Sequence, residues 1–305
     1  MFQLPYREER DGFWGAHTST INWCEEDYNI THYCAEFVNT LTNLMFLYLG
    51  FVGIRNCLKY SEPPIFILAY VGYTVVGIGS MAFHATLKYE MQLADELPMI
   101  YTVCIMGVAT FSYKRSRLFS AGVAALFIFI GWAITAYYLN SKDPVFHQVA
   151  YALMTCWIVY TGIYDMQYRL RPALEKRNPA DYQRIMKQMW QCAFAGQGLF
   201  LFGFFIWNMD NIFCHSLKAA RNRILLPWAI VLEGHGWWHI FTGLGGYYFI
   251  TWRLWLHRCL DGDEKQFRLQ WPSIFTSVPQ VVPRSARDAS SNGAPSYAEV
   301  TKKAQ

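Results

Sequence analysis

Seven long stretches without a charged side chain constrain this chain more than any other feature. Asp, Glu, Lys and Arg are absent from residues 37–54, 63–87, 97–113, 118–141, 144–164, 188–209 and 234–252. A helix needs roughly 17 to 25 apolar residues to cross a bilayer, and every stretch reaches that length. A water-soluble domain would have to bury seven such helices inside polar elements that the sequence lacks. We therefore expect an all-α integral membrane protein, a bundle of seven transmembrane helices.

The charges between these stretches predict how the bundle is oriented. Cytosolic loops of membrane proteins carry an excess of Lys and Arg. The segments on the N-terminal side hold 7 of the 26 Lys and Arg residues, and those on the opposite side hold 19. We therefore expect a luminal N-terminus and a cytosolic C-terminus. The net charge of +4 then reflects topology, and we expect no nucleic-acid partner.

Composition divides the chain into three parts. Residues 1–33 form a polar luminal segment, residues 34–258 form the helical bundle, and residues 259–305 form a cytosolic tail that we expect to be disordered. Most of the eight cysteines lie in or near apolar runs, as small hydrophobic residues do. Cys24 and Cys214 instead fall in segments on the oxidising side, where disulfides persist. Their topology favours a bridge between them.

Histidines interrupt three of the apolar stretches, and ionisable residues inside a membrane are usually functional. His235 and His239 are four residues apart in "EGHGWWHIFTG", so one helix face presents both imidazoles. A third histidine would complete the ligand set of a catalytic zinc. His84 is the best-placed candidate, and His147 is the rival. The pattern leaves two interpretations open, an intramembrane zinc site or histidines that only form hydrogen bonds in the core.

Two further polar residues accompany His84. Ser80 precedes it by four residues on the same helix face, and Asp95 follows it by eleven, after a short turn. A carboxylate beside an activated water is a natural proton acceptor, so we interpret Asp95 as catalytic. The alternative is that Asp95 caps a helix. We interpret the neighbouring Glu90 and Glu96 as interfacial charges.

Acidic residues gather in "NWCEEDYNITHYCAEF" at the luminal edge. Calcium takes six to eight oxygen ligands from carboxylates, amides and carbonyls. Asn22, Glu25 and Asp27 are spaced like a small loop around one ion, and Glu36 could close it. These residues could hold calcium, but no EF-hand pattern is present, so the pattern alone favours the alternative. The alternative is a solvated acidic loop.

Taken together, the motifs resemble those of the alkaline ceramidases. These are seven-span membrane amidases in a superfamily that includes the adiponectin and progestin receptors. The resemblance covers nearly all of the chain before the tail, and rests on "TSTI-WCEE", "AEF-NTLTN", "GIGSMAFHATL", "ADELPM", "WN-DNIFC" and "WWH--TGLG". It implies zinc-dependent, calcium-supported hydrolysis of a ceramide, dihydroceramide or phytoceramide to a sphingoid base and a fatty acid. It also implies the membrane of the endoplasmic reticulum or Golgi.

The resemblance assigns roles to individual residues. It implies that Asp95 accepts and later donates a proton, and that Ser80 stabilises the oxyanion. It implies that zinc is held by His84, His235 and His239. It implies that calcium is held by Asn22, the carbonyl of Trp23, Glu25, Asp27 and Glu36.

One difference from the family qualifies this comparison. The family commonly has Asp and Asn where this chain has Asn22 and Asp27, an exchange that keeps the number of carboxylates. The resemblance also supports the bridge between Cys24 and Cys214.

A receptor-like lipid-binding protein of the same superfamily is the alternative function. The acidic loop together with "SMAFH" favours the enzyme, because a receptor would not need both an ion site and a metal-activated nucleophile.

Overall fold

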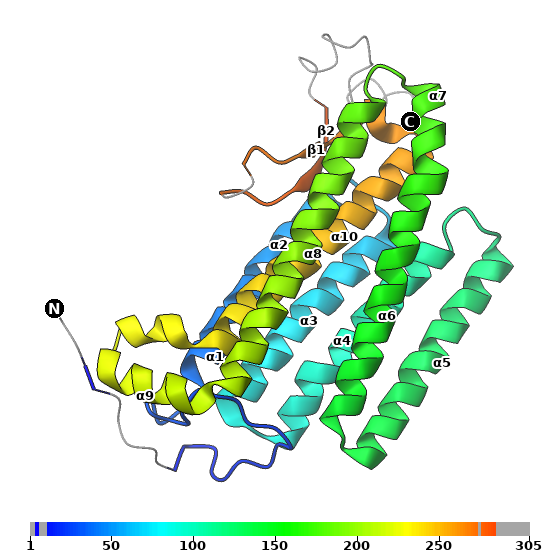
Figure 1. Ribbon diagram of the computed structural model, residues 1–305. Helices are drawn as coiled ribbons and strands as arrows, with labels where there is room; N and C mark the ends of the chain where they lie inside the picture. The colour runs from blue at the N-terminus through cyan, green and yellow to red at the C-terminus, as the bar shows by residue number, and fades with distance from the viewer. Residues whose placement is uncertain (1–3, 6–10, 274–275, 285–305) are drawn as a thin grey trace.

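The structure is a computed structural model that describes residues 4–5, 11–273 and 276–284. Long helices run side by side through it as one bundle (Figure 1). These long helices are α2 (Leu44–Lys59), α3 (Pro64–Thr86), α4 (Tyr89–Phe111), α5 (Arg117–Ser141), α6 (Pro144–Tyr164), α8 (Tyr182–Ile212) and α10 (Gly234–Asp261). The shorter helices are α1 (Phe37–Thr42), the π-helix η1 (Asp165–Leu170), α7 (Arg171–Arg177), α9 (Cys214–Ile224) and the 3₁₀ helices η2 (Trp228–Leu232) and η3 (Asp263–Lys265).

Five segments in the described part of the chain are long and apolar enough to cross a membrane. They are α3, α4, α5, α8 and the continuous run of α1 and α2 over Phe37–Lys59. The expected all-α integral membrane protein is therefore confirmed. Helices α6 and α10 have 21 and 28 residues, but their His, Tyr, Trp and Gly content lowers their hydropathy. The expectation of seven spans stays a prediction.

Capping residues fix where several helices begin and end. Ser116 precedes α5 and its hydroxyl accepts a hydrogen bond from the Phe119 amide at 3.2 Å. Asp143 precedes α6 and accepts from the Val145 amide at 3.0 Å, satisfying an amide that has no partner inside the helix. At the end of α10, Gly262 takes a φ of 93°, which favours glycine.

A glycine brings α3 and α4 into direct backbone contact. A Cβ atom on Gly79 would lie 1.9 Å from the carbonyl oxygen of Ala94 and 2.9 Å from the amide nitrogen of Asp95. Any larger residue at this position would force the two helices apart. Small residues allow such close approach between membrane helices. Consequently Ser80, the next residue on α3, is placed against Asp95 on α4.

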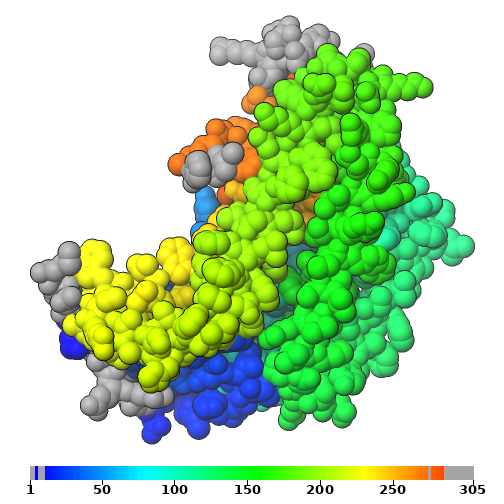
Figure 2. Space-filling model, viewed as in Figure 1, coloured from blue at the N-terminus to red at the C-terminus, as the bar shows by residue number. Residues whose placement is uncertain are grey.

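The N-terminal segment and α9 lie at the same end of the bundle (Figure 1). A disulfide joins Cys24 in this segment to Cys214 at the start of α9, so the predicted bridge is confirmed. Figure 2 shows the region of α9 and η2 projecting sideways from the long helices. The disulfide thus ties an N-terminal loop to the segment that leads into α10.

A two-stranded antiparallel hairpin follows α10 at the other end of the bundle (Figure 1). Its strands are β1 (Phe267–Gln270) and β2 (Gln280–Pro283). Asn56 holds it to the bundle by donating to the carbonyl of Val281 at 2.9 Å. The expected disordered tail is therefore ordered over the hairpin, where Phe267 and Leu269 on β1 and Val281 and Val282 on β2 are apolar and buried. Residues 285–305 of that tail lie outside the described residues.

Candidate metal centre and catalytic site

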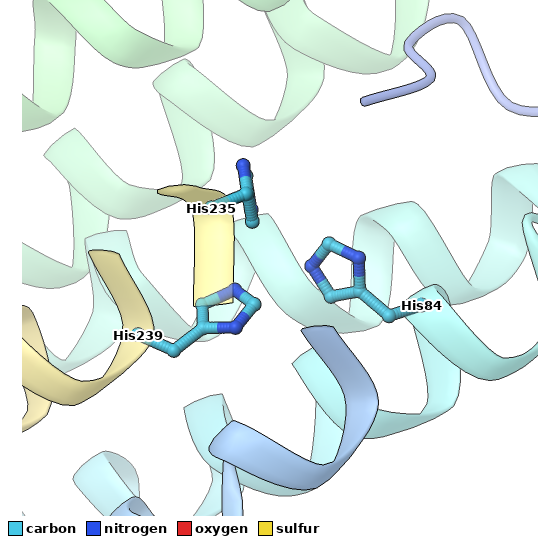
Figure 3. Close-up of side chains that lie close together, drawn as sticks. All are labelled: His84, His235 and His239. Carbon is cyan, nitrogen blue, oxygen red and sulfur yellow. The ribbon is translucent and has the colours of Figure 1, made fainter. Parts of the chain in front are cut away.

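Three histidines meet inside the bundle. His84 comes from α3, and His235 and His239 come from successive turns at the start of α10 (Figure 3). One ligand atom from each lies within 4.8 Å of the other two. The ring centroids are 4.7 to 5.0 Å apart, and the side chains are 1%, 4% and 5% exposed. The structure therefore brings together the three residues that the sequence predicted as a group.

The hydrogen bonds of these histidines leave nitrogen lone pairs available for a metal. Glu36 hydrogen-bonds Nδ1 of His84, which keeps the proton on Nδ1 and the lone pair on Nε2. Nδ1 of His239 lies 3.0 Å from the Thr42 hydroxyl, whose own proton is directed to backbone carbonyls one turn back. Nδ1 of His235 is buried without a hydrogen-bond partner. Neutral imidazoles with free ring nitrogens fit a zinc ion.

Ser80 and Asp95 form the second part of the site. The Ser80 hydroxyl accepts a hydrogen bond from Nδ2 of Asn43 at 2.9 Å and lies beside the Asp95 carboxylate. Ser80 is 3% exposed, and Asp95 is half-buried. Because Ser80 lies one turn from His84 on α3, the serine and the carboxylate lie on the histidine side of this helix.

The rival histidine takes no part in this cluster. Nε2 of His147 lies 2.9 Å from the backbone carbonyl of Glu96. Glu96 is itself 6% exposed and accepts hydrogen bonds from the Tyr138 hydroxyl and, at 3.1 Å, from Nε2 of Gln92. The interpretation of Glu96 as an interfacial charge was therefore wrong. The next residue along a helix points about 100° away, so Glu96 faces α5 while Asp95 faces α3.

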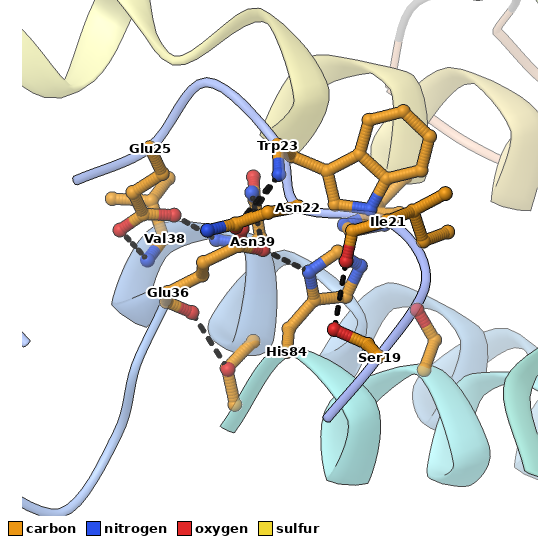
Figure 4. Close-up of polar contacts among 12 residues, drawn as sticks. Ser19, Ile21, Asn22, Trp23, Glu25, Glu36, Val38, Asn39 and His84 are labelled. Carbon is orange, nitrogen blue, oxygen red and sulfur yellow. Dashed lines mark hydrogen bonds and ion pairs between the residues drawn. The ribbon is translucent and has the colours of Figure 1, made fainter. Parts of the chain in front are cut away.

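The acidic loop packs against the histidine centre (Figure 4). Both carboxylate oxygens of Glu25 accept amide hydrogen bonds, from Val38 at 2.7 Å and Asn39 at 2.8 Å, at the start of α1. Glu36, which contacts His84, also accepts from the amide of Trp23 at 3.2 Å. The Trp23 ring lies 4.4 Å, centroid to centroid, from that of His235. One loop therefore contacts two of the three histidines through a carboxylate and an indole ring.

Burial of the Glu25 and Glu36 carboxylates in this loop favours binding of a cation. It raises the pKa of Glu36 to about 7, and together with the charge of Glu36 it raises the pKa of Glu25 to about 8. A nearby divalent cation would keep both carboxylates ionised. The donors at the predicted calcium positions are all oxygens, which fits calcium. Among the described residues, however, the ligand atoms of Glu25, Asp27 and Glu36 do not converge as those of the histidines do. Calcium binding thus requires these side chains to turn toward a shared centre.

A shallow apolar hollow lies on the face of α10 that is turned away from the histidines. It lies between α8, α9 and α10 and has a volume of about 380 Å³. Phe202, Trp237 and Phe241 are among its lining residues, and it reaches Gly234, the residue before His235. Such a hollow suits a hydrocarbon chain.

Several contacts of the site were not predicted from the sequence. Asn43 holds Ser80, Thr42 adjoins His239, and Glu36 orients His84. All three residues belong to the motif "AEF-NTLTN", so the sequence did contain a signal for them. Polar residues spaced three and four apart in the first apolar stretch mark a helix face that needs polar partners.

These observations describe an integral membrane protein whose helices surround a buried centre of three histidines, a serine and an aspartate. Comparison with known proteins identifies the family to which this protein belongs. The model of the family described as Ceramidase matches residues 15–282, and the chain belongs to this family. The family resemblance and the prediction of an enzyme are thereby confirmed.

Curated relatives agree with this assignment. The chain is 37% identical over 247 residues to alkaline ceramidase 3 of Mus musculus, covering 81% of this chain and 86% of the relative. It is 36% identical over 266 residues to alkaline ceramidase YPC1 of Saccharomyces cerevisiae, covering 82% of this chain and 81% of the relative. An alkaline ceramidase of Arabidopsis thaliana is 27% identical over 239 residues, with 77% and 82% covered.

Proposed function

We propose that this protein hydrolyses the amide bond of ceramides and releases a sphingoid base and a free fatty acid. The observation that carries the proposal is the convergence of His84, His235 and His239 in the interior of a chain that belongs to the ceramidase family.

The histidines would hold a zinc ion, which supplies a water nucleophile near neutral pH and polarises the amide carbonyl. Asp95 accepts the proton of the attacking water and later returns it to the leaving amine. Ser80 donates its hydroxyl hydrogen to Asp95 while the carboxylate is charged. Once Asp95 is protonated, that hydroxyl is free to turn toward the oxyanion. Asn43 holds the serine oxygen in place throughout.

The test is a product assay with the purified protein. Ceramide, dihydroceramide and phytoceramide are supplied in detergent micelles, and the sphingoid base is quantified by mass spectrometry. Turnover of at least one of the three by a zinc-loaded sample is the expected result. A protein that binds these lipids but releases no sphingoid base would instead be a receptor-like lipid-binding protein.

Replacing Ser80 with alanine is expected to lower kcat about 100-fold, the usual effect of removing one oxyanion donor. The KM for ceramide and the zinc content should stay close to those of the wild type, because Ser80 is not one of the three histidines that would hold the zinc. Steady-state kinetics and elemental analysis of the same preparation check both statements. An unchanged kcat would remove Ser80 from the mechanism.

We also propose that the acidic loop binds calcium through Asn22, the carbonyl of Trp23, Glu25, Asp27 and Glu36. A cation here would offset the repulsion between the buried carboxylates and fix the loop against the histidine centre. The loop contacts the centre through Trp23 and Glu36, so calcium would act by ordering those contacts.

Removing calcium is therefore expected to lower both the hydrolysis rate and the melting temperature. The measurement uses a calcium-selective chelator, with zinc content determined before and after treatment so that zinc loss is not mistaken for calcium loss. Adding calcium should restore the rate, and adding magnesium should not, because magnesium demands a stricter octahedral geometry. A constant rate despite verified calcium loss would contradict the proposal.

We further propose seven membrane spans, with α6 and α10 as the two that composition alone does not reveal. The N-terminal segment would be luminal and the hairpin cytosolic, in the endoplasmic reticulum or Golgi membrane. The disulfide between Cys24 and Cys214 supports this orientation, because disulfides persist in the oxidising lumen.

A further inference from the structure

We propose that Arg221, on α9, is a positioning residue for His235. Its guanidinium is fully buried and contacts three groups. Nη1 donates to Oε2 of Glu233 at 2.6 Å. Nη2 donates to the carbonyl oxygen of Cys24 at 2.6 Å and lies 3.1 Å from Oε2 of Glu26. One side chain therefore joins α9, the N-terminal loop and the residue that immediately precedes α10.

The start of α10 needs such support from outside. Glu233 occupies the capping position of α10, but its side chain forms no capping hydrogen bond. The amide of Gly234 is instead satisfied by Oδ1 of Asp210, on α8, at 3.1 Å. A Cβ atom on Gly234 would lie 2.7 Å from Cβ of Asp210, so the two elements are in close contact. Asp210 and Arg221 together fix the first turn of α10 from two neighbouring helices.

This first turn determines where His235 lies. His235 is two residues beyond Glu233 and one beyond Gly234, so a shift or rotation of the helix start moves its imidazole directly. His239, one turn further along, has contacts of its own with Thr42. The His235 ring packs against Trp23, but its Nδ1 has no hydrogen-bond partner that would fix its orientation. Its position therefore depends on the backbone restraints at Glu233 and Gly234 more than the positions of the other two histidines do.

The guanidinium group suits this role better than other cations. Arg presents several donors in a planar fork, so it can bind a carboxylate and a carbonyl at the same time. Lys would keep the charge but cannot hold Glu233, Glu26 and the Cys24 carbonyl in one fixed geometry. Groups that orient metal ligands without touching the metal typically change metal affinity or activity 10- to 100-fold when they are replaced.

The experiment must separate positioning from simple stability, because removing Arg221 leaves Glu233 buried without a partner, which is destabilising in itself. Four variants of the full-length protein are compared with the wild type. They are Arg221→Lys, Arg221→Met, the double variant Arg221→Met with Glu233→Gln, and the control Arg223→Met, which changes an exposed arginine on the same helix. Zinc affinity is measured by competition with a chromogenic chelator, alongside kcat, KM and melting temperature.

Zinc affinity and kcat are expected to fall about 10- to 100-fold in both single variants, with little change in KM. The double variant should regain melting temperature, because the buried carboxylate is gone, but not zinc affinity. The control should match the wild type in all four measurements. Recovery of zinc affinity in the double variant would overturn the inference, as would single variants that lose melting temperature alone.

This inference rests on the proposed function, yet the two can fail separately. A wild-type protein that binds no zinc would contradict the proposed function. A wild-type protein that binds zinc, with Arg221 variants of equal zinc affinity, would contradict only the positioning role.

Discussion

Replacing His239 with alanine is expected to abolish ceramide hydrolysis. A catalytic metal stabilises the transition state by several kcal/mol, so its loss should lower kcat/KM by at least about 1,000-fold. His84 and His235 alone leave two ligands, one fewer than the three that catalytic zinc sites use. Elemental analysis of the purified variant should therefore show zinc well below that of the wild type, and the product assay should show no sphingoid base.

The matched control is His215→Ala, which removes an exposed histidine on α9 and should leave zinc content and turnover unchanged. His147→Gln tests the rival ligand. Because His147 contacts Glu96 and not the histidine centre, this variant should keep its zinc. A His239→Ala protein that still hydrolyses ceramide after verified zinc removal would contradict the zinc mechanism.

The histidine centre illustrates what the sequence could and could not predict. The spacing of four residues placed His235 and His239 on one face of a helix, because that spacing is a local property of the helix. The third member was open between His84 and His147, since periodicity does not reveal which helices become neighbours. The structure places α3 next to α10 at this level, where the ring centroids of His84 and His239 are 4.7 Å apart.

Local spacing was also insufficient where burial depends on a neighbouring helix. Glu96 was interpreted as interfacial because it follows Asp95 near the luminal end of a span. Glu96 is buried against Gln92, on its own helix, and Tyr138, on α5. Tyr138 is far from Glu96 in the sequence. The hairpin after α10 was missed for a related reason. The polar average of that region concealed the alternation that buries Phe267 and Leu269.

The disulfide could be predicted because its reasoning was topological and needed no packing detail. Charge counts placed Cys24 and Cys214 on the same side of the membrane, and the bond joins them. The contacts that the disulfide supports were not visible in the sequence. In the sequence, Arg221 is only one of three basic residues in a segment expected to be luminal. In the structure it is fully buried between the N-terminal loop and the start of α10. Burial of a charge by partners distant in sequence is the kind of feature that only the structure reveals.

Asp95→Asn is expected to lower kcat about 100- to 10,000-fold, the range typical of a lost general base. Asparagine has nearly the same size and can still accept a hydrogen bond from Ser80 through its amide oxygen. It cannot take a proton from water. The three histidines are untouched, so the variant should retain its zinc, and the fall should appear in kcat with little change in the KM for ceramide.

This pattern separates Asp95 from the residues around it. A lost zinc ligand removes metal and activity together, whereas Asp95→Asn should remove activity while the metal stays. Glu90→Gln is the matched control, because it neutralises an exposed carboxylate on the same helix and should leave kcat unchanged. If Asp95 only capped or packed α4, the asparagine variant would keep most of its activity, since asparagine preserves both the shape and the hydrogen bond. Near-wild-type turnover by Asp95→Asn would therefore assign proton transfer to another group.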